Sequence, residues 1–161
     1  MPEDNSIRVR PTEISDIPSL QKVLDGTKLF PSDLLPDMID GFLSEEPADD
    51  LWYTAEQNNE VVGFCYAAPE ELTDGTWNML AIAILPATQG SGVGRELVRV
   101  LEADLQNKGH RVLIADTSGT DAFAKTREFY RKVGYTEEAR IRGFWGAGDD
   151  KVVFWKNISK E

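Results

Sequence analysis

The clearest hydrophobic pattern lies in the middle of the chain. Residues 79–85 form an apolar run without a charge, which is typical of a strand buried on both faces. Pro86 cannot extend such a strand. A helix is predicted beyond it, because five apolar residues repeat with the spacing of one helical face: Val93, Leu97, Val100, Leu101 and Leu105. The sequence therefore predicts a buried strand, a turn and a long helix that ends near Gly109.

The residues before this segment predict a strand, two helices and a hairpin. Residues 7–10 alternate between apolar and charged side chains, as a half-buried strand does. Two amphipathic stretches follow, one beginning near Ser15 and one near Ser32, and both are predicted to be helices. Residues 51–56 and 61–68 are predicted to pair as a hairpin, because Asn tolerates the tight turn between them.

The residues after the long helix predict a strand at 111–116, a helix at 123–133 and a final hairpin of strands 135–141 and 152–155. The full order is β-α-α-β-β-β-α-β-α-β-β. It predicts an α/β fold with a mixed sheet, antiparallel at the start, with a parallel pair where a helix crosses between strands. The chain has no internal repeat or linker, so one domain is expected over residues 1–161, with its core at about 7–156.

Composition narrows the class of protein. A chain of 161 residues suits one domain with a proper core. No apolar run approaches the ~20 residues of a membrane span, and residues 1–10 lack the apolar region of a secretory signal. The net charge of -11 argues against nucleic-acid binding, which needs a basic surface. Cys65 is the single cysteine and lies in an apolar run, which fits a buried thiol in a reducing cytoplasm.

The glycine-rich turn is the first candidate for chemistry. Gly90, Gly92 and Gly94 let the backbone turn tightly, and the amides at the start of the following helix have no partners within it. Together with the helix dipole, such a turn binds anions, most often phosphates. A P-loop would need a lysine after the glycines, and a dinucleotide fingerprint would need a glycine where Arg95 stands. A plain structural turn remains the alternative.

Basic residues gather in the two helices that would flank such a ligand. They either form an attractive field for an anion or are ordinary solvated helix charges: Arg95, Arg99, Lys125, Arg127, Arg131 and Lys132.

Two motifs resemble those of the GNAT superfamily of N-acetyltransferases. Residues 89–94 read Q-x-x-G-x-G, similar to the acyl-CoA loop [RQ]-x-x-G-x-[GA] that lies between a strand and a helix in that family. Residues 129–135, F-Y-R-K-V-G-Y, resemble the family's C-terminal motif, F/L-Y-x-x-x-G-F/Y. The predicted order of elements is also that of the family.

The resemblance implies a function and a site. It implies acyl transfer, most simply of acetyl from acetyl-CoA, to a primary amine of an unidentified small-molecule or peptide acceptor by direct attack. Two central parallel strands would splay apart, and the pantetheine arm of CoA would lie along Ile82, Ala83 and Ile84. Tyr130 would be the general acid for the leaving thiolate. The pyrophosphate would be held by the loop and the helix start: Gln89, Gly90, Ser91, Gly92, Val93, Gly94 and Arg95.

The sequence also departs from the family pattern. Many members carry a Glu on the strand before the glycine loop as general base, whereas Asn78 is the polar side chain near the start of this strand. The base would then be Glu70, Glu71 or Asp74 acting through water, or the amine would arrive deprotonated. An Asn at the start of the last helix is replaced by Phe123. A CoA-binding or regulatory domain without turnover is therefore the alternative function.

The remaining candidates concern the acceptor and the partners. Phe30, Trp77 and Asn78 are predicted to contact the acceptor, with core packing as the alternative. His110 is the single histidine and no cluster has the spacing of metal ligands, so no metal site is expected. Four aromatic residues of the last hairpin would support a homodimer or belong to the core: Phe144, Trp145, Phe154 and Trp155.

Overall fold

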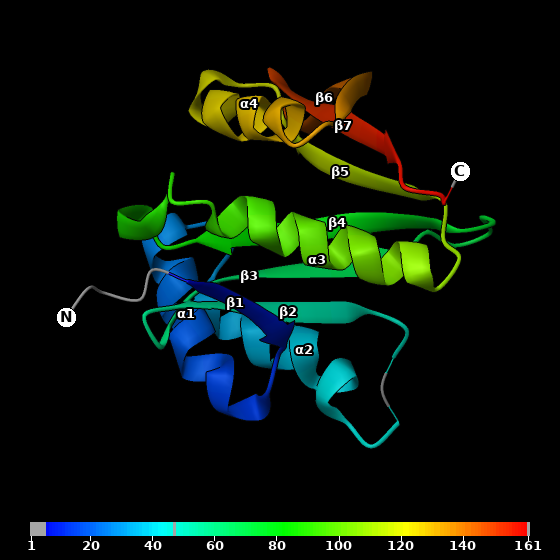
Figure 1. Ribbon diagram of the computed structural model, residues 1–161. Coiled ribbons are helices and arrows are strands. Elements are labelled where there is room, and N and C mark those ends of the chain that lie inside the picture. Colours follow the sequence, from blue (N-terminus) through cyan, green and yellow to red (C-terminus); the bar gives the residue numbers. More distant parts are fainter. Residues whose placement is uncertain (1–5, 47, 161) are drawn as a thin grey trace. The chain divides into compact units, whose positions relative to one another are not determined.

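The computed structural model describes residues 6–46 and 48–160; residues 1–5, Pro47 and Glu161, which the expected single domain includes, lie outside the described part. The described residues form seven strands, four α-helices and short 3-10 turns, and the strands and α-helices are labelled in Figure 1. The strands are β1 (Ile7–Pro11), β2 (Leu51–Gln57), β3 (Glu60–Pro69), β4 (Thr76–Ile84), β5 (Val112–Ser118), β6 (Thr136–Gly146) and β7 (Asp149–Asn157). The helices are α1 (Ile17–Thr27), α2 (Leu35–Leu43), α3 (Val93–Asn107) and α4 (Ala124–Lys132). The order of elements is the one that the hydrophobic pattern predicts.

The chain forms two compact units. The N-terminal unit consists of Met1–Ala68 and Ala81–Leu101, and the C-terminal unit consists of Pro69–Leu80 and Glu102–Glu161. Both β4 and α3 therefore contribute their residues to both units. Along the mixed sheet the strand order is β1-β2-β3-β4-β5-β7-β6.

In the N-terminal unit, β1, β2 and β3 pair in antiparallel fashion. Asn58 and Asn59 both have positive φ, 54° and 63°, so the predicted tight turn of the hairpin is confirmed. Gly63 lies where β3 passes close to the end of β4, since a Cβ there would come within 2.9 Å of the Ala83 carbonyl oxygen. The amide of Leu85 then donates to the Val62 carbonyl at 2.8 Å, which fixes the exit of β4 against β3.

Helices α1 and α2 cover this part of the sheet with an apolar core. Their buried side chains pack against β2, β3 and the end of β4, in one cluster made of Leu20, Val23, Leu24, Leu35, Ile39, Trp52, Phe64, Ala81 and Ala83. Gly26 near the end of α1 approaches Pro86 closely, because a Cβ on Gly26 would lie 3.2 Å from Pro86 Cδ. The helix thereby supports the turn that follows β4.

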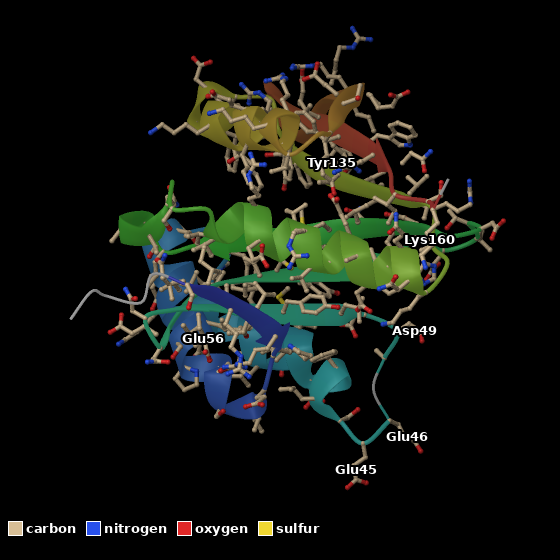
Figure 2. All side chains as sticks on the ribbon, viewed as in Figure 1. Glu45, Glu46, Asp49, Glu56, Tyr135 and Lys160 are labelled. Atoms are coloured by element: carbon tan, nitrogen blue, oxygen red, sulfur yellow. The ribbon has the colours of Figure 1, made fainter. Side chains whose placement is uncertain are left out.

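A partly buried ion-pair cluster joins β1 to β2 and to the segment that enters α1. Arg10 lies 2.7 Å from Asp16 and 2.7 Å from Glu56, which is labelled in Figure 2. Burial opposes ionisation of Asp16, but hydrogen bonds from Arg10 and from the Glu13 amide outweigh it and hold the pKa of Asp16 below its usual value. The stability of the N-terminal unit should therefore depend on pH through the ionisation of Asp16.

In the C-terminal unit, the first residues of β4 pair with β5 in parallel fashion. The register joins Thr76–Asn78 to Val112–Ile114 and ends there, although both strands continue. On its other side β5 pairs with β7 along its whole length, from Val112 opposite Asn157 to Ser118 opposite Lys151. The early end of the parallel register agrees with the predicted splay of the two central strands.

The last hairpin is longer than its sequence pattern predicts. Strand β6 reaches Gly146 and β7 begins at Asp149. Asp150 supports this extension, since its carboxylate accepts hydrogen bonds from the Gly143 amide and from Arg140, which hold the pKa of Asp150 below its usual value. Pairing with a neighbouring strand, rather than local hydrophobic alternation, sets the length of these strands.

The aromatic residues of this hairpin divide between core and surface. Phe154 is fully buried, so its assignment to an exposed surface would be wrong, and its ring lies 5.2 Å from that of Tyr130. Phe144, Trp145 and Trp155 remain 49%, 50% and 37% exposed. Tyr135, labelled in Figure 2, is buried and donates to Glu102 at 2.8 Å. Over residues 6–46 and 48–160, no helix has the length and apolar character needed to cross a membrane.

Candidate functional site

The glycine loop has the backbone geometry of an open anion site. Gly90 and Gly92 have φ of +85° and +95°, a region that side chains other than glycine rarely adopt. Among the described residues, a Cβ on Gly90 would meet no atom within 4 Å, and one on Gly92 would meet only Ile7 Cδ1 at 3.7 Å. The glycines are therefore required by the turn itself, and the space beside them is open to a ligand.

Side chains of the loop hold its shape from within. Gln89 Nε2 donates to the Ile84 carbonyl at 3.1 Å, and Ser91 Oγ donates to the Thr88 carbonyl at 2.6 Å. The predicted cofactor residues Gln89 and Ser91 thus brace the turn onto the end of β4. Neither of these hydrogen bonds uses a backbone amide of the loop as its donor.

The start of α3 supplies those amides. Glu96 donates its amide to the Gly92 carbonyl at 3.1 Å, which is the first turn of helical bonding. The amides of Val93, Gly94 and Arg95 precede that bond and have no acceptor inside a helix. The helix dipole adds partial positive charge at this end. Backbone donors and dipole together make the loop suited to a phosphate or pyrophosphate.

The structure separates the six basic residues into paired and unpaired groups. Arg99 pairs with Glu96, Arg131 with Glu137, and Lys132 with Glu128. Arg127 donates to the carbonyls of Ser118 and Thr120 at 2.8 and 2.7 Å, so it fastens the loop after β5 to α4. Among the described ion pairs none includes Arg95 or Lys125. Arg95 is exposed in the first turn of α3 and takes part in none of the ion pairs of the described residues.

Tyr130, the predicted general acid, lies on the core side of α4. It is 4% exposed, and its ring lies 5.2 to 5.9 Å from the rings of Phe129, Tyr135 and Phe154. Packing on this aromatic cluster fixes the ring in place. A phenol held in a fixed orientation is suited to donating a proton to a group at one position. It is equally suited to a structural role in the core.

Asn78 joins two carboxylates that are far apart in sequence. Its Nδ2 donates to Glu70 Oε1 at 2.9 Å and to Asp116 Oδ2 at 3.2 Å. Lys151 Nζ lies 3.4 Å from the same Asp116 oxygen. The strand that lacks the family's Glu therefore has two carboxylates beside it, one from the loop before β4 and one from β5.

Sequence reasoning identified Asn78 and Glu70 but missed Asp116. The signal lay in the strand register. Asn78 pairs with Ile114 in the parallel register, and Asp116 is two residues further along β5, on the same face as Ile114. Sequence alone does not provide that register.

The other two predicted acceptor residues, Trp77 and Phe30, pack against neighbouring side chains. Trp77 is 6% exposed, and its ring lies 5.2 Å from that of His110. Phe30 is half-buried and packs on the apolar core of the N-terminal unit. Glu71 and Asp74, the other two candidate bases, are exposed. In the described residues no group of three or more His, Cys, Asp or Glu side chains could hold a metal ion.

Comparison with known proteins identifies the class of protein that this loop and fold define. A family model described as an acetyltransferase (GNAT) domain matches residues 48–137, more than half of the chain. The chain therefore belongs to the GNAT acetyltransferase family.

Individual relatives agree with this assignment. The mycothiol acetyltransferase of Amycolatopsis mediterranei is 31% identical over 94 residues, which are 55% of this chain and 31% of that protein. The [ribosomal protein bS18]-alanine N-acetyltransferase of Haemophilus influenzae is 32% identical over 83 residues, 50% of this chain and 51% of that protein. The aligned residues thus span about a third and about half of these relatives.

A solved structure of a GNAT-family protein from Desulfovibrio desulfuricans has the same fold. It is 29% identical, with a TM-score of 0.88, and the match covers 95% of this chain and 99% of that one. The predicted α/β fold with a mixed sheet is confirmed.

Proposed function

We propose that the protein is an N-acetyltransferase that transfers acetyl from acetyl-CoA to a primary amine. The glycine loop is the observation that carries the proposal. Its two positive-φ glycines open directly onto the first turn of α3, and no side chain fills the space beside Gly90. This is the arrangement that a CoA pyrophosphate needs, and membership of the GNAT family identifies CoA as the ligand.

The donor would contact two neighbouring segments of the N-terminal unit. The amides of residues 92–95 and the side chain of Arg95 would bind the pyrophosphate, in a loop that Gln89 and Ser91 hold in shape. The pantetheine arm would pair with the backbone of Ile82, Ala83 and Ile84, which precede the loop on β4. A backbone amide in that stretch would also stabilise the developing charge on the thioester oxygen.

Tyr130 would protonate the leaving thiolate. Acyl transfer forms a bond between the amine nitrogen and the acetyl carbon and breaks the carbon–sulfur bond, so the departing sulfur needs a proton. A phenol of ordinary pKa ~10 is well matched to a thiol of ordinary pKa ~8.5. The assignment is supported by the F-Y-x-x-x-G-Y motif and by the rigid packing of the ring.

The proposal extends to the surroundings of the enzyme. The acceptor would be a small molecule or a peptide. The buried, single Cys65 supports a cytoplasmic location. The half-exposed Phe144, Trp145 and Trp155 support a homodimer, which sedimentation analysis at several protein concentrations would test.

A ligand comparison tests the loop, and a release assay tests the activity. CoA and acetyl-CoA should raise the melting temperature, whereas ATP and NAD at the same concentration should not. Stabilisation by ATP or NAD alone would contradict the proposal and favour a nucleotide-binding module. Release of the CoA thiol across a panel of amines should then report turnover. Stabilisation by acetyl-CoA without thiol release would favour a CoA-binding domain without activity.

A further inference from the structure

Two buried oxygen atoms in the C-terminal unit have no hydrogen-bond donor among the described residues. They are Asn78 Oδ1 and Asp116 Oδ1, on the two strands that form the parallel pair. Asn78 is only 5% exposed. A buried acceptor without a donor costs about 1–3 kcal/mol, so most folded proteins avoid it. Two such acceptors on side chains that contact each other indicate that a donor from outside the chain belongs there.

The charge around these atoms indicates that the missing donor is a cation. Glu70 and Asp116 both reach Asn78 Nδ2, and Lys151 is the cation that lies near, 3.4 Å from Asp116 Oδ2. No ion pair of Glu70 occurs among those of the described residues. The cluster thus holds two carboxylates against one ammonium, which leaves one negative charge without a partner.

The orientation of the Asn78 amide supports the same conclusion. Both of its Nδ2 hydrogens are directed at carboxylates, which fixes its oxygen on the other side. The carbonyl oxygen of Asn78 and the second oxygen of Asp116 are therefore both acceptors. A primary ammonium group has three N–H donors and one positive charge, so it would supply donors to both orphan oxygens and balance the charge.

An apolar rim lies beside the cluster. The Lys151 ammonium that contacts Asp116 also lies 4.4 Å from the centre of the Phe144 ring. The Trp145 ring lies 4.7 Å from the Phe144 ring. A hydrogen bond from Trp145 Nε1 to the Thr117 carbonyl, 3.3 Å long, holds it there. Both rings are about half exposed. They offer apolar surface to the carbon skeleton that carries an amine.

We propose that Asn78, Asp116 and Glu70 form a binding subsite for the primary ammonium group of the acceptor, with Phe144 and Trp145 contacting its apolar part. This inference rests on the proposed acetyltransferase function and deepens it. It gives the carboxylates near β4 the task of binding and positioning the amine. It also predicts that acceptors with a primary amine on an apolar carbon chain are preferred over neutral or strongly anionic molecules.

The test is a titration of the full-length protein with n-butylammonium chloride, with and without saturating CoA. The side-chain amide resonances of Asn78 are followed by two-dimensional NMR. Saturable shifts are expected with butylammonium. 1-Butanol lacks the charge and tetramethylammonium lacks N–H donors. The apparent affinity of each, obtained from the same shifts, should be at least tenfold lower than that of butylammonium. Sodium chloride at equal ionic strength is the control for screening.

Substitution of Asp116 separates a ligand site from a structural cluster. Asp116→Asn should reduce butylammonium affinity at least tenfold. It should keep or raise the melting temperature, because the new amide can donate to Asn78 Oδ1. Glu70→Gln, at the half-buried edge of the cluster, should also weaken butylammonium binding. This variant provides the test if Asp116→Asn does not fold. Asp121→Asn removes the same charge from an exposed turn and should leave the affinity unchanged.

Equal shifts with butylammonium and 1-butanol would overturn the inference, as would unchanged affinity in both Asp116→Asn and Glu70→Gln. The two oxygens would then be hydrated by water only. If acetyl-CoA binds and these results occur, the ammonium subsite fails while the proposed function stands. If butylammonium binds as expected but acetyl-CoA does not, the proposed function fails and the cation site remains.

Discussion

Substitution of Gly92 by alanine tests the pyrophosphate loop with the smallest change. Gly92 has φ of +95°, and a Cβ there would have only Ile7 Cδ1 near it, at the ordinary contact distance of 3.7 Å. The protein therefore has room for the methyl group, and the cost to the fold is backbone strain of about 1–2 kcal/mol. For a chain of this size that strain corresponds to a loss of about 2–8 °C in melting temperature.

The effect on acetyl-CoA should be larger than the effect on stability. The methyl group would occupy the open side of the loop, where in the proposed site the phosphate oxygens would approach the amides of residues 92–95. Loss of one charge-assisted hydrogen bond costs about 1.5–3 kcal/mol. Acetyl-CoA affinity should therefore fall about 10- to 100-fold, measured by isothermal titration at a temperature where both proteins are folded.

Gly109→Ala is the matched control. Gly109 has φ of +86°, and a Cβ there would meet no atom within 4 Å, so the variant carries similar backbone strain at the far end of α3. It should lose a similar amount of stability and keep the acetyl-CoA affinity of the unmodified protein. If Gly92→Ala binds acetyl-CoA within about twofold of the unmodified protein, the loop does not hold the pyrophosphate.

Three further predictions address the acid, the ion-pair cluster and the cysteine. Tyr130→Phe should lower kcat about 100-fold or more while acetyl-CoA affinity stays unchanged, and an unaltered kcat would remove Tyr130 from the mechanism. The pKa of Asp16 is lowered in the folded state, so its stabilisation is present above the unfolded pKa of ~3.9 and is lost as pH falls through the folded value. Asp16→Asn should accordingly cost about 1–3 kcal/mol at pH 7 and flatten the acid limb of stability measured by urea unfolding; an identical pH dependence would contradict this role. Burial raises the pKa of Cys65 to about 12, so iodoacetamide at pH 8 should modify the unfolded protein and spare the folded one, as judged by mass spectrometry, whereas rapid labelling of the folded protein would show that the thiol is accessible.

The parts of the fold that sequence predicts well are those with a strong local pattern. The apolar face of α3, from Val93 to Leu105, repeats with helical spacing, and four of its five residues are fully buried. The hairpin at Asn58 and Asn59 has its own turn chemistry. The glycine loop is predictable for the same reason, since its positive φ angles demand glycine whatever the rest of the chain does.

The parts that sequence reasoning missed depend on contacts between distant residues. Strand β5 continues through Thr117 and Ser118, and β7 provides the partners Val152 and Lys151. Thr117 and Ser118 are both polar, so they do not show the alternation of apolar and polar residues that predicts a strand. Asp116 escaped notice because a general base was sought on β4 and in the loop before it. Only the parallel register of β4 and β5 brings its carboxylate to Asn78.

The motif of the glycine loop does not by itself reveal what each of its residues does. Gln89 is the residue that begins the acyl-CoA motif, and its side chain bonds to the Ile84 carbonyl. In the proposed site its contribution would therefore be to position the backbone. The sequence pattern predicts which residues form the loop, and the hydrogen bonds indicate which atoms remain for the ligand.

Product analysis with acetyl-CoA labelled with carbon-13 at the acetyl carbonyl tests the central claim most directly. The protein is incubated with the labelled donor and n-butylamine, and the carbonyl signal and the free CoA thiol are measured together. An acetyltransferase should give an amide carbonyl carrying the label, with one thiol released for each amide formed, and a much slower reaction with Gly92→Ala. Thiol release with labelled acetate in place of amide, or bound donor that is never consumed across a panel of primary amines, would contradict it.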